Sequence, residues 1–129
     1  MFDQIIDANI NRASEGLRVL EEYVRFVAKK KQWTQQLSMI RKKINKAYPQ
    51  SVQLLNIRNS ESDMRAKEIP AKRNTVSELL TANFKRVQES LRVLEEYSAR
   101  SIFNECRYDM YELEKQITLT LCKKTIKKG

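Results

Sequence analysis

Residues 8–23 read ANINRASEGLRVLEEY, and residues 82–97 read ANFKRVQESLRVLEEY. The two stretches are identical at 11 of their 16 positions, and the second copy lies 74 residues after the first. A weaker similarity follows each copy, in which Leu37, Ile40 and Ile44 align with Met110, Leu113 and Ile117 at an offset of 73. Because one helical unit cannot bury its apolar face alone, such a repeat indicates two units that pack together. We therefore predict an all-α fold, a four-helix bundle of two repeated helical hairpins with approximate two-fold symmetry.

Helices are expected over four stretches in which apolar residues recur three and four positions apart, residues 3–30, 34–47, 75–100 and 104–125. Asp3 is the expected N-cap of the first helix, and Thr75 and Glu78 have the spacing of a capping box at the third. The apolar stripes are expected to place Ile5 and Val27 inward on the first helix, and Tyr108 and Tyr111 inward on the last.

The whole chain is predicted to form a single helical domain over residues 1–129. Its parts are repeats at 3–48 and 75–122, a connecting loop at 50–74 and a basic tail at 123–129. A loop of that length is unusual in a compact domain unless it is functional or disordered.

Lysine and arginine number 25 against 16 aspartates and glutamates, for a formal net charge of +9. This charge favours anionic partners, which include nucleotides, phosphorylated metabolites, nucleic acid and membrane surfaces. The chain has no histidine, which removes the commonest general base and the commonest zinc ligand. Cys106 and Cys122 on one helix would lie about 24 Å apart, too far for a disulfide. With no basic leader and no apolar run of membrane-spanning length, we expect a cytoplasmic protein with reduced thiols and no membrane partner.

Polar residues are repeated along with the apolar ones. Asn9 and Asn83 fall near the middle of the apolar stripe, where an amide needs a hydrogen-bond partner. They either pair with each other and fix the register, as a buried Asn does in coiled coils, or contact a ligand. Arg12 and Arg86 border the stripe, where a guanidinium can bind phosphate with two parallel hydrogen bonds.

Gly16 lies on the Asn9 face and aligns with Ser90. A small residue there permits either close contact between helices, which is the more frequent reason, or room for a flat ligand.

The other repeated charges have two interpretations. Glu15, Arg18, Glu89 and Arg92 either contact a ligand or form a salt-bridged surface together with i,i+4 pairs such as Glu21 and Arg25, each worth about 0.2–0.5 kcal/mol. In the connecting loop, Arg58, Asp63 and Arg73 either hold magnesium and phosphate oxygens or belong to a solvated linker.

The repeated motif resembles a known family. Residues 6–21, 82–97 and 111–115 are similar to the all-helical hydroxymethylpyrimidine phosphate kinase domain found N-terminal to thiamine phosphate synthase in some bacteria. The resemblance implies ATP-dependent phosphorylation of 4-amino-5-hydroxymethyl-2-methylpyrimidine phosphate to the diphosphate, in thiamine biosynthesis, with ATP and Mg as cofactors. The candidate catalytic residues are Asp63, Glu15 and Glu89, and Asp63 is also the candidate metal ligand. The candidate phosphate and ligand contacts are Asn9, Arg12, Arg18, Arg58, Arg73, Asn83, Arg86 and Arg92.

Two rival functions stay open. A non-catalytic docking or regulatory domain would bind a phosphorylated metabolite or a partner enzyme without turnover. A basic nucleic-acid-binding bundle would lose affinity steeply with salt, and it is disfavoured because the basic runs lack interleaved aromatic residues. The partners expected are the phosphorylated pyrimidine and ATP, with thiamine phosphate synthase and a second copy of the chain as further candidates.

Overall fold

The computed structural model describes residues 1–48 and 73–128, with side chains described as far as Leu121. The described elements are α1 (Asp3–Tyr23), the π-helix η1 (Val24–Ala28), α2 (Lys31–Ala47), α4 (Val76–Ser98) and α5 (Ser101–Lys128). The predicted all-α fold with four helices packed together is confirmed. Arg58, Asp63 and the connecting loop as far as residue 72 lie outside the described residues.

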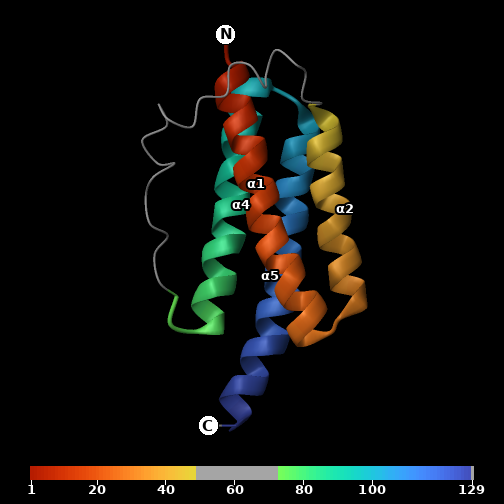
Figure 1. Ribbon diagram of the computed structural model, residues 1–129, viewed down its shortest axis with the longest axis vertical. Coiled ribbons are helices and arrows are strands. Elements are labelled where there is room, and N and C mark those ends of the chain that lie inside the picture. Colours follow the sequence, from red (N-terminus) through yellow and green to blue (C-terminus); the bar gives the residue numbers. More distant parts are fainter. Residues whose placement is uncertain (49–72, 129) are drawn as a thin grey trace.

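The helices pack around one apolar core (Figure 1). Helix α1 packs against α4 and α2, and α5 packs against α4 and α2. The largest fully buried side chains come from all four helices and include Leu17, Leu20, Leu37, Ile44, Phe84, Leu91, Phe103 and Met110. The last turns of α5 extend past the ends of the other helices and contain residues 123–128, which were assigned to the basic tail. The approximate two-fold symmetry stays a prediction.

The predicted Thr75 cap at the start of α4 is confirmed, whereas the reciprocal bond of the Glu78 side chain is shifted by one residue, from Thr75 to Asn74. The Thr75 side-chain oxygen accepts a hydrogen bond from the Glu78 backbone N–H at 3.0 Å, and the Glu78 carboxylate accepts one from the Asn74 N–H at 3.0 Å. The prediction of Asp3 as an N-cap is wrong. Phe2 occupies that position without a side-chain bond, and the Asp3 carboxylate instead accepts a 2.6 Å hydrogen bond from the Tyr48 hydroxyl.

The first helix ends in a π turn rather than continuing as α-helix to residue 30. Lys29 adopts a left-handed conformation with φ of 55°, and Val24 O accepts a hydrogen bond from the Lys30 N–H at 3.0 Å. A π turn has more residues per turn than an α-helix, so the apolar stripe loses its register at this point. The predicted inward position of Val27 is therefore wrong, because its side chain is 64% exposed, and Ile5 in the first turn is 37% exposed.

The buried stripe of α5 consists of Phe103, Cys106, Met110, Leu113 and Ile117. The predicted core positions of Tyr108 and Tyr111 are wrong, since both rings are exposed on the flank of this stripe. Both rings lie beside the Arg107 guanidinium, whose carbon is 5.2 Å and 5.7 Å from their centroids.

Candidate functional site

Helices α1 and α4 approach each other closely at Gly16. A methyl group placed on Gly16 would lie 2.8 Å from Val87 Cγ2, 3.3 Å from Arg86 Cδ and 3.3 Å from the Asn83 carbonyl oxygen. These distances leave no room for a flat ligand. Gly16 therefore serves close packing between helices, the more frequent of the two reasons considered for a small residue here.

The two repeated asparagines are both buried, with 5% of Asn9 and 7% of Asn83 exposed. Each side-chain nitrogen donates to the carbonyl four residues earlier in its own helix, Ile5 at 2.9 Å and Leu79 at 2.8 Å. Neither amide donates to the other, so the direct Asn–Asn pair is not formed. The identical local bonding in both copies satisfies the amide nitrogens, and it fixes the orientation of each side chain at the α1–α4 contact.

The structure places only some of the expected site residues at the α1–α4 contact. Arg86 is exposed, but its aliphatic stem rests against Gly16, and Arg12 is half-buried on α1. Glu15 and Glu89 are exposed on the outer surface of their helices. Arg73 is exposed and lies before the start of α4 at Val76, and among the described residues no hydrogen bond or ion pair joins it to the other candidates.

Two partly buried ion pairs were not predicted. Glu21 accepts hydrogen bonds from Arg41 Nε at 2.7 Å and Nη2 at 3.2 Å. Glu95 accepts from Nε and Nη2 of Arg107. The predicted Glu21–Arg25 pair is wrong, because the Glu21 carboxylate faces α2. A sequence signal existed: Glu21 follows Leu17 by one helical turn, on the buried face, where a carboxylate needs a partner.

The two ion pairs correct the predicted alignment of the second helices. Glu21 and Glu95 are 74 residues apart, whereas Arg41 and Arg107 are 66 apart. At this offset Leu37, Ile40 and Ile44 correspond to Phe103, Cys106 and Met110, all of them buried. The predicted alignment of the second helices, at an offset of 73, is therefore wrong by seven residues, which is one heptad. The cause is the longer turn of the first hairpin, whose left-handed residue is Lys29, compared with Ala99 in the second hairpin.

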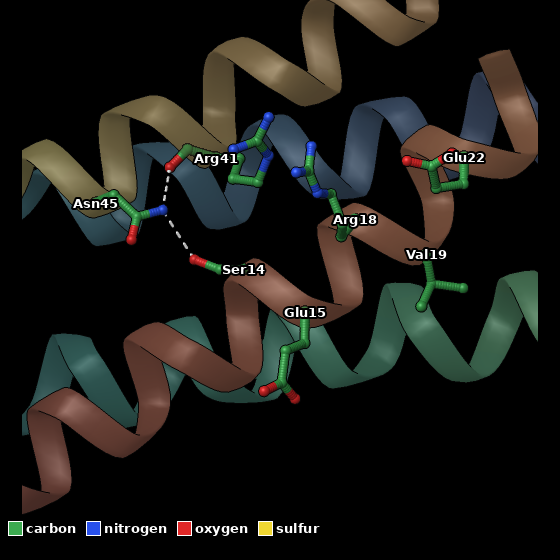
Figure 2. A pocket seen from close by; sticks show the side chains of 7 residues that line it. All are labelled: Ser14, Glu15, Arg18, Val19, Glu22, Arg41 and Asn45. Carbon is green, nitrogen blue, oxygen red and sulfur yellow. Dashed lines mark hydrogen bonds between the residues drawn. The ribbon is translucent and has the colours of Figure 1, made fainter. Parts of the chain in front are cut away.

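A groove of about 650 Å³ opens between α1 and α2 (Figure 2). It is lined by Ser14, Glu15, Arg18, Val19, Glu22, Arg41 and Asn45. In Figure 2 the guanidinium groups of Arg18 and Arg41 both point into this space, while the Glu15 carboxylate points away from Arg41. The Asn45 amide donates to Ser14 Oγ at 2.9 Å and to the Arg41 carbonyl at 2.8 Å. A groove of this size falls in the range of small-molecule sites.

The repeated arginines Arg18 and Arg92 differ in their partners. Arg92 lies 2.7 Å from Glu96 and 3.9 Å from Glu95, so the salt-bridge interpretation describes it. Within the described part of the chain, Arg18 makes no ion pair or hydrogen bond, although Glu15 and Glu22 are one turn away on the same helix.

The ionisable side chains of Cys106 and Glu95 have structural roles. Burial raises the pKa of the Cys106 thiol to about 11, which makes it a poor nucleophile. Burial would raise the pKa of Glu95, but the hydrogen bonds from Arg107 and Asn104 outweigh it and hold that pKa below its usual value. Among the residues described, no group of three or more His, Cys, Asp or Glu side chains could hold a metal ion. The candidate metal ligand Asp63 lies outside them.

A buried carboxylate, Asp7, was also missed as a site candidate. Only 3% of it is exposed, and its charge is one of the influences that raise the pKa of Tyr48, after the hydrogen bond from that hydroxyl to Asp3 and burial. Its neighbour Ile6 is buried as well, so the stripe around the first turns of α1 is wider than a strict three-and-four spacing indicates.

Comparisons with known proteins place the chain among thiamine-biosynthesis proteins. It is 40% identical over 120 residues to a thiamine-phosphate synthase of Prochlorococcus marinus, covering 86% of this chain and 34% of the relative. For thiamine-phosphate synthases of Thermosynechococcus vestitus and Synechocystis sp. the identities are 36% over 125 residues and 33% over 120 residues, covering 90% and 86% of this chain and 35% and 34% of the relatives. The chain thus spans about a third of the length of the curated relatives it matches.

No solved structure matches the chain, and within residues 1–48 and 73–128 no helix has the length and apolar character needed to cross a bilayer. The ThiD2 family matches residues 4–116, nearly the whole chain. The match includes both copies of the repeat, α1 without its first residue, all of α2 and α4, and more than half of α5. The chain therefore belongs to the ThiD2 family, and it is a helical domain related to part of the thiamine-phosphate synthases.

Proposed function

We propose that the chain phosphorylates 4-amino-5-hydroxymethyl-2-methylpyrimidine phosphate to the diphosphate with ATP. The observation that carries the proposal is the relationship to thiamine-phosphate synthases over nearly the whole chain. A diphosphate is a better leaving group than a monophosphate, so a pyrimidine diphosphate is a chemically suitable substrate for joining to a second ring. A domain that makes this diphosphate fits beside such a synthase.

The geometry at the α1–α4 contact is compatible with this reaction. Arg86 holds its stem against Gly16 and keeps its guanidinium at the surface, and Arg12 occupies the matching repeat position on α1. Two such forks on neighbouring helices can bind two phosphate groups and bring them together. The net charge of +9 adds attraction for both anionic substrates.

The chemistry requires charge neutralisation more than a base. In the proposed step an oxygen of the pyrimidine monophosphate forms a bond to the γ-phosphorus of ATP, and the bond from that phosphorus to ADP breaks. The second pKa of a phosphate monoester is about 6, so at pH 7 the attacking oxygen is mostly deprotonated already. Glu15 and Glu89, the candidate bases, are thus needed less than the arginines that offset the repulsion between phosphates.

Magnesium, when bound, would supply further charge neutralisation on the phosphate oxygens. Because Mg²⁺ usually takes one or two carboxylates plus substrate phosphates, the lack of a three-carboxylate cluster in the described part is compatible with it. Asp63 remains the proposed ligand.

The test mixes purified protein, ATP, Mg²⁺ and the pyrimidine phosphate, and follows the diphosphate by coupling to a separate thiamine phosphate synthase. Arg86→Met keeps an apolar stem against Gly16 but removes the fork, so we expect at least a tenfold loss of kcat/KM with an unchanged melting temperature. Arg25→Met is the matched control, since Arg25 is an exposed arginine outside the α1–α4 contact, and it is expected to retain activity.

A well-folded wild-type protein that yields no diphosphate would overturn the kinase proposal. If calorimetry then detects binding of the pyrimidine phosphate, the docking or regulatory function replaces it. A parallel reaction with the unphosphorylated pyrimidine checks the substrate, because the hydroxyl nucleophile would need a base that the phosphate does not.

A further inference from the structure

We propose that the α1–α2 groove binds the phosphate group of a small phosphate ester through Arg18 and Arg41, and that the corresponding surface between α4 and α5 does not. The groove is distinct from the α1–α4 contact, but Arg18 and Glu15, which line it, are also candidate residues of the kinase site. The inference therefore rests in part on the proposed function, although it requires binding only.

The groove offers several hydrogen-bond donors that no described residue satisfies. Arg18 has no ion pair among the residues described. Arg41 uses Nε and Nη2 on Glu21, which leaves Nη1 to donate elsewhere. Ser14 Oγ accepts from Asn45, so its hydroxyl hydrogen is available as a third donor.

Arg41 is also held in place before any ligand arrives. Its two bonds to the buried Glu21 carboxylate fix the guanidinium plane, and its side chain is only 23% exposed. A guanidinium that is already ordered loses little conformational entropy on binding. Arg18 is exposed and lies on the same groove, so it can close on the ligand from the opposite side.

Two carboxylates, Glu15 and Glu22, also line the groove. Both are exposed, and Glu15 points away from Arg41 in Figure 2. Their repulsion toward an anion near Arg41 and Asn45 is therefore screened by solvent. The side of the groove formed by Val19 and the aliphatic stems of neighbouring residues can accommodate an organic body, which favours a phosphate ester over a free inorganic ion.

In the second half of the chain the same donors are already used. Arg92 is paired with Glu96, and the residue matching Ser14, Gln88, donates to Glu114 at 3.0 Å. Tyr111, which matches Asn45 at the offset of 66, accepts a 3.2 Å hydrogen bond from Arg107 and stacks against it. The polar side chains of the α4–α5 surface thus bond to one another, whereas Arg18 in the α1–α2 groove has no such partner among the described residues.

The experiment titrates ¹⁵N-labelled full-length protein with inorganic phosphate, then with the pyrimidine phosphate and with a non-hydrolysable ATP analogue. Amide shifts are expected at Ser14, Arg18 and Asn45, and the tighter of the two esters identifies the source of the phosphate. Arg18→Gln is expected to weaken binding at least tenfold.

Two control variants sharpen the result. Lys115→Gln removes one charge from exposed α5 and is expected to leave the affinity within twofold of wild type. Arg92→Gln tests whether the α4–α5 surface lacks the site, and it is also expected to leave the affinity within twofold of wild type. Equal weakening by Arg18→Gln and Arg92→Gln, or shifts confined to residues outside the groove, would overturn the inference. Turnover without groove shifts would overturn this inference alone, and groove binding without turnover would overturn only the kinase proposal.

Discussion

Replacing Gly16 with alanine tests the close approach of α1 and α4. The added methyl group would lie 2.8 Å from Val87 Cγ2 and 3.3 Å from the Asn83 carbonyl oxygen. Neither neighbour can move easily. Val87 is fully buried and, being β-branched, has one strongly preferred rotamer in a helix, while the Asn83 oxygen belongs to the backbone.

Two effects oppose each other in this variant. Alanine gains about 1 kcal/mol of helix propensity over glycine. Overpacking of a tight interface costs about 1–3 kcal/mol, and a contact of 2.8 Å against a buried side chain belongs in the upper part of that range. We therefore expect Gly16→Ala to lower the free energy of unfolding by about 1 kcal/mol.

A double-mutant cycle separates the clash from other effects. Val87→Ala alone should cost about 2 kcal/mol through lost burial and the cavity it leaves. In the double variant the new methyl enters that cavity, so the combined loss should be about 1–2 kcal/mol smaller than the sum. Ser90→Ala is the control, because Ser90 occupies the matching repeat position and already has a Cβ.

Urea unfolding followed by circular dichroism at 222 nm measures the four free energies of the cycle and that of the Ser90→Ala control. The close approach would be refuted if Gly16→Ala stabilised the protein by the full helix propensity, or if the two substitutions proved additive.

Two further predictions concern single interactions. Thr75→Ala removes the acceptor for the Glu78 N–H and should cost about 1 kcal/mol in urea unfolding; no loss would mean that the cap is replaced by water. Because hydrogen bonds from Arg107 and Asn104 outweigh burial and lower the pKa of Glu95, its ionised form stabilises the fold fully above the unfolded pKa of about 4.3. The stability difference between wild type and Glu95→Gln should therefore shrink as the pH falls below about 4, and a difference that is constant with pH would contradict the ion pair.

The fold was largely predictable because it depends on periodicity. Apolar residues three and four positions apart predicted the helices, and the repeated leucines Leu17, Leu20, Leu91 and Leu94 lie in the core. One error lies where the period changes, and the errors at Tyr108 and Tyr111 lie on the flank of a regular stripe. The π turn after Tyr23 depends on backbone hydrogen bonds that no residue pattern in this stretch specifies, and the inward assignment of Val27 just beyond it was wrong.

The candidate site was predictable only in part. Burial of Asn9 and Asn83 followed from their place on the stripe, but their actual partners are carbonyls of their own helices. The partners of Glu21 and Glu95 are on other helices. Finding them requires the register of α2 against α1 and of α5 against α4, and a heptad apolar pattern does not determine that register.

The ion pairs determine this register more strongly than the packing of apolar side chains does. Because apolar residues on α5 recur about every seven positions, sliding the helix by one heptad would still place hydrophobic side chains inward. The same slide would separate Arg107 from Glu95 and leave a nearly buried carboxylate without its partner, which costs roughly a few kcal/mol. The Glu21–Arg41 pair fixes α2 in the same way, but the longer first turn brings different residues alongside. Asn45 therefore lies where Tyr111 lies in the second hairpin. Among the described residues, the groove of the first hairpin keeps an unpaired arginine, Arg18, whereas Arg92 of the second is paired with Glu96.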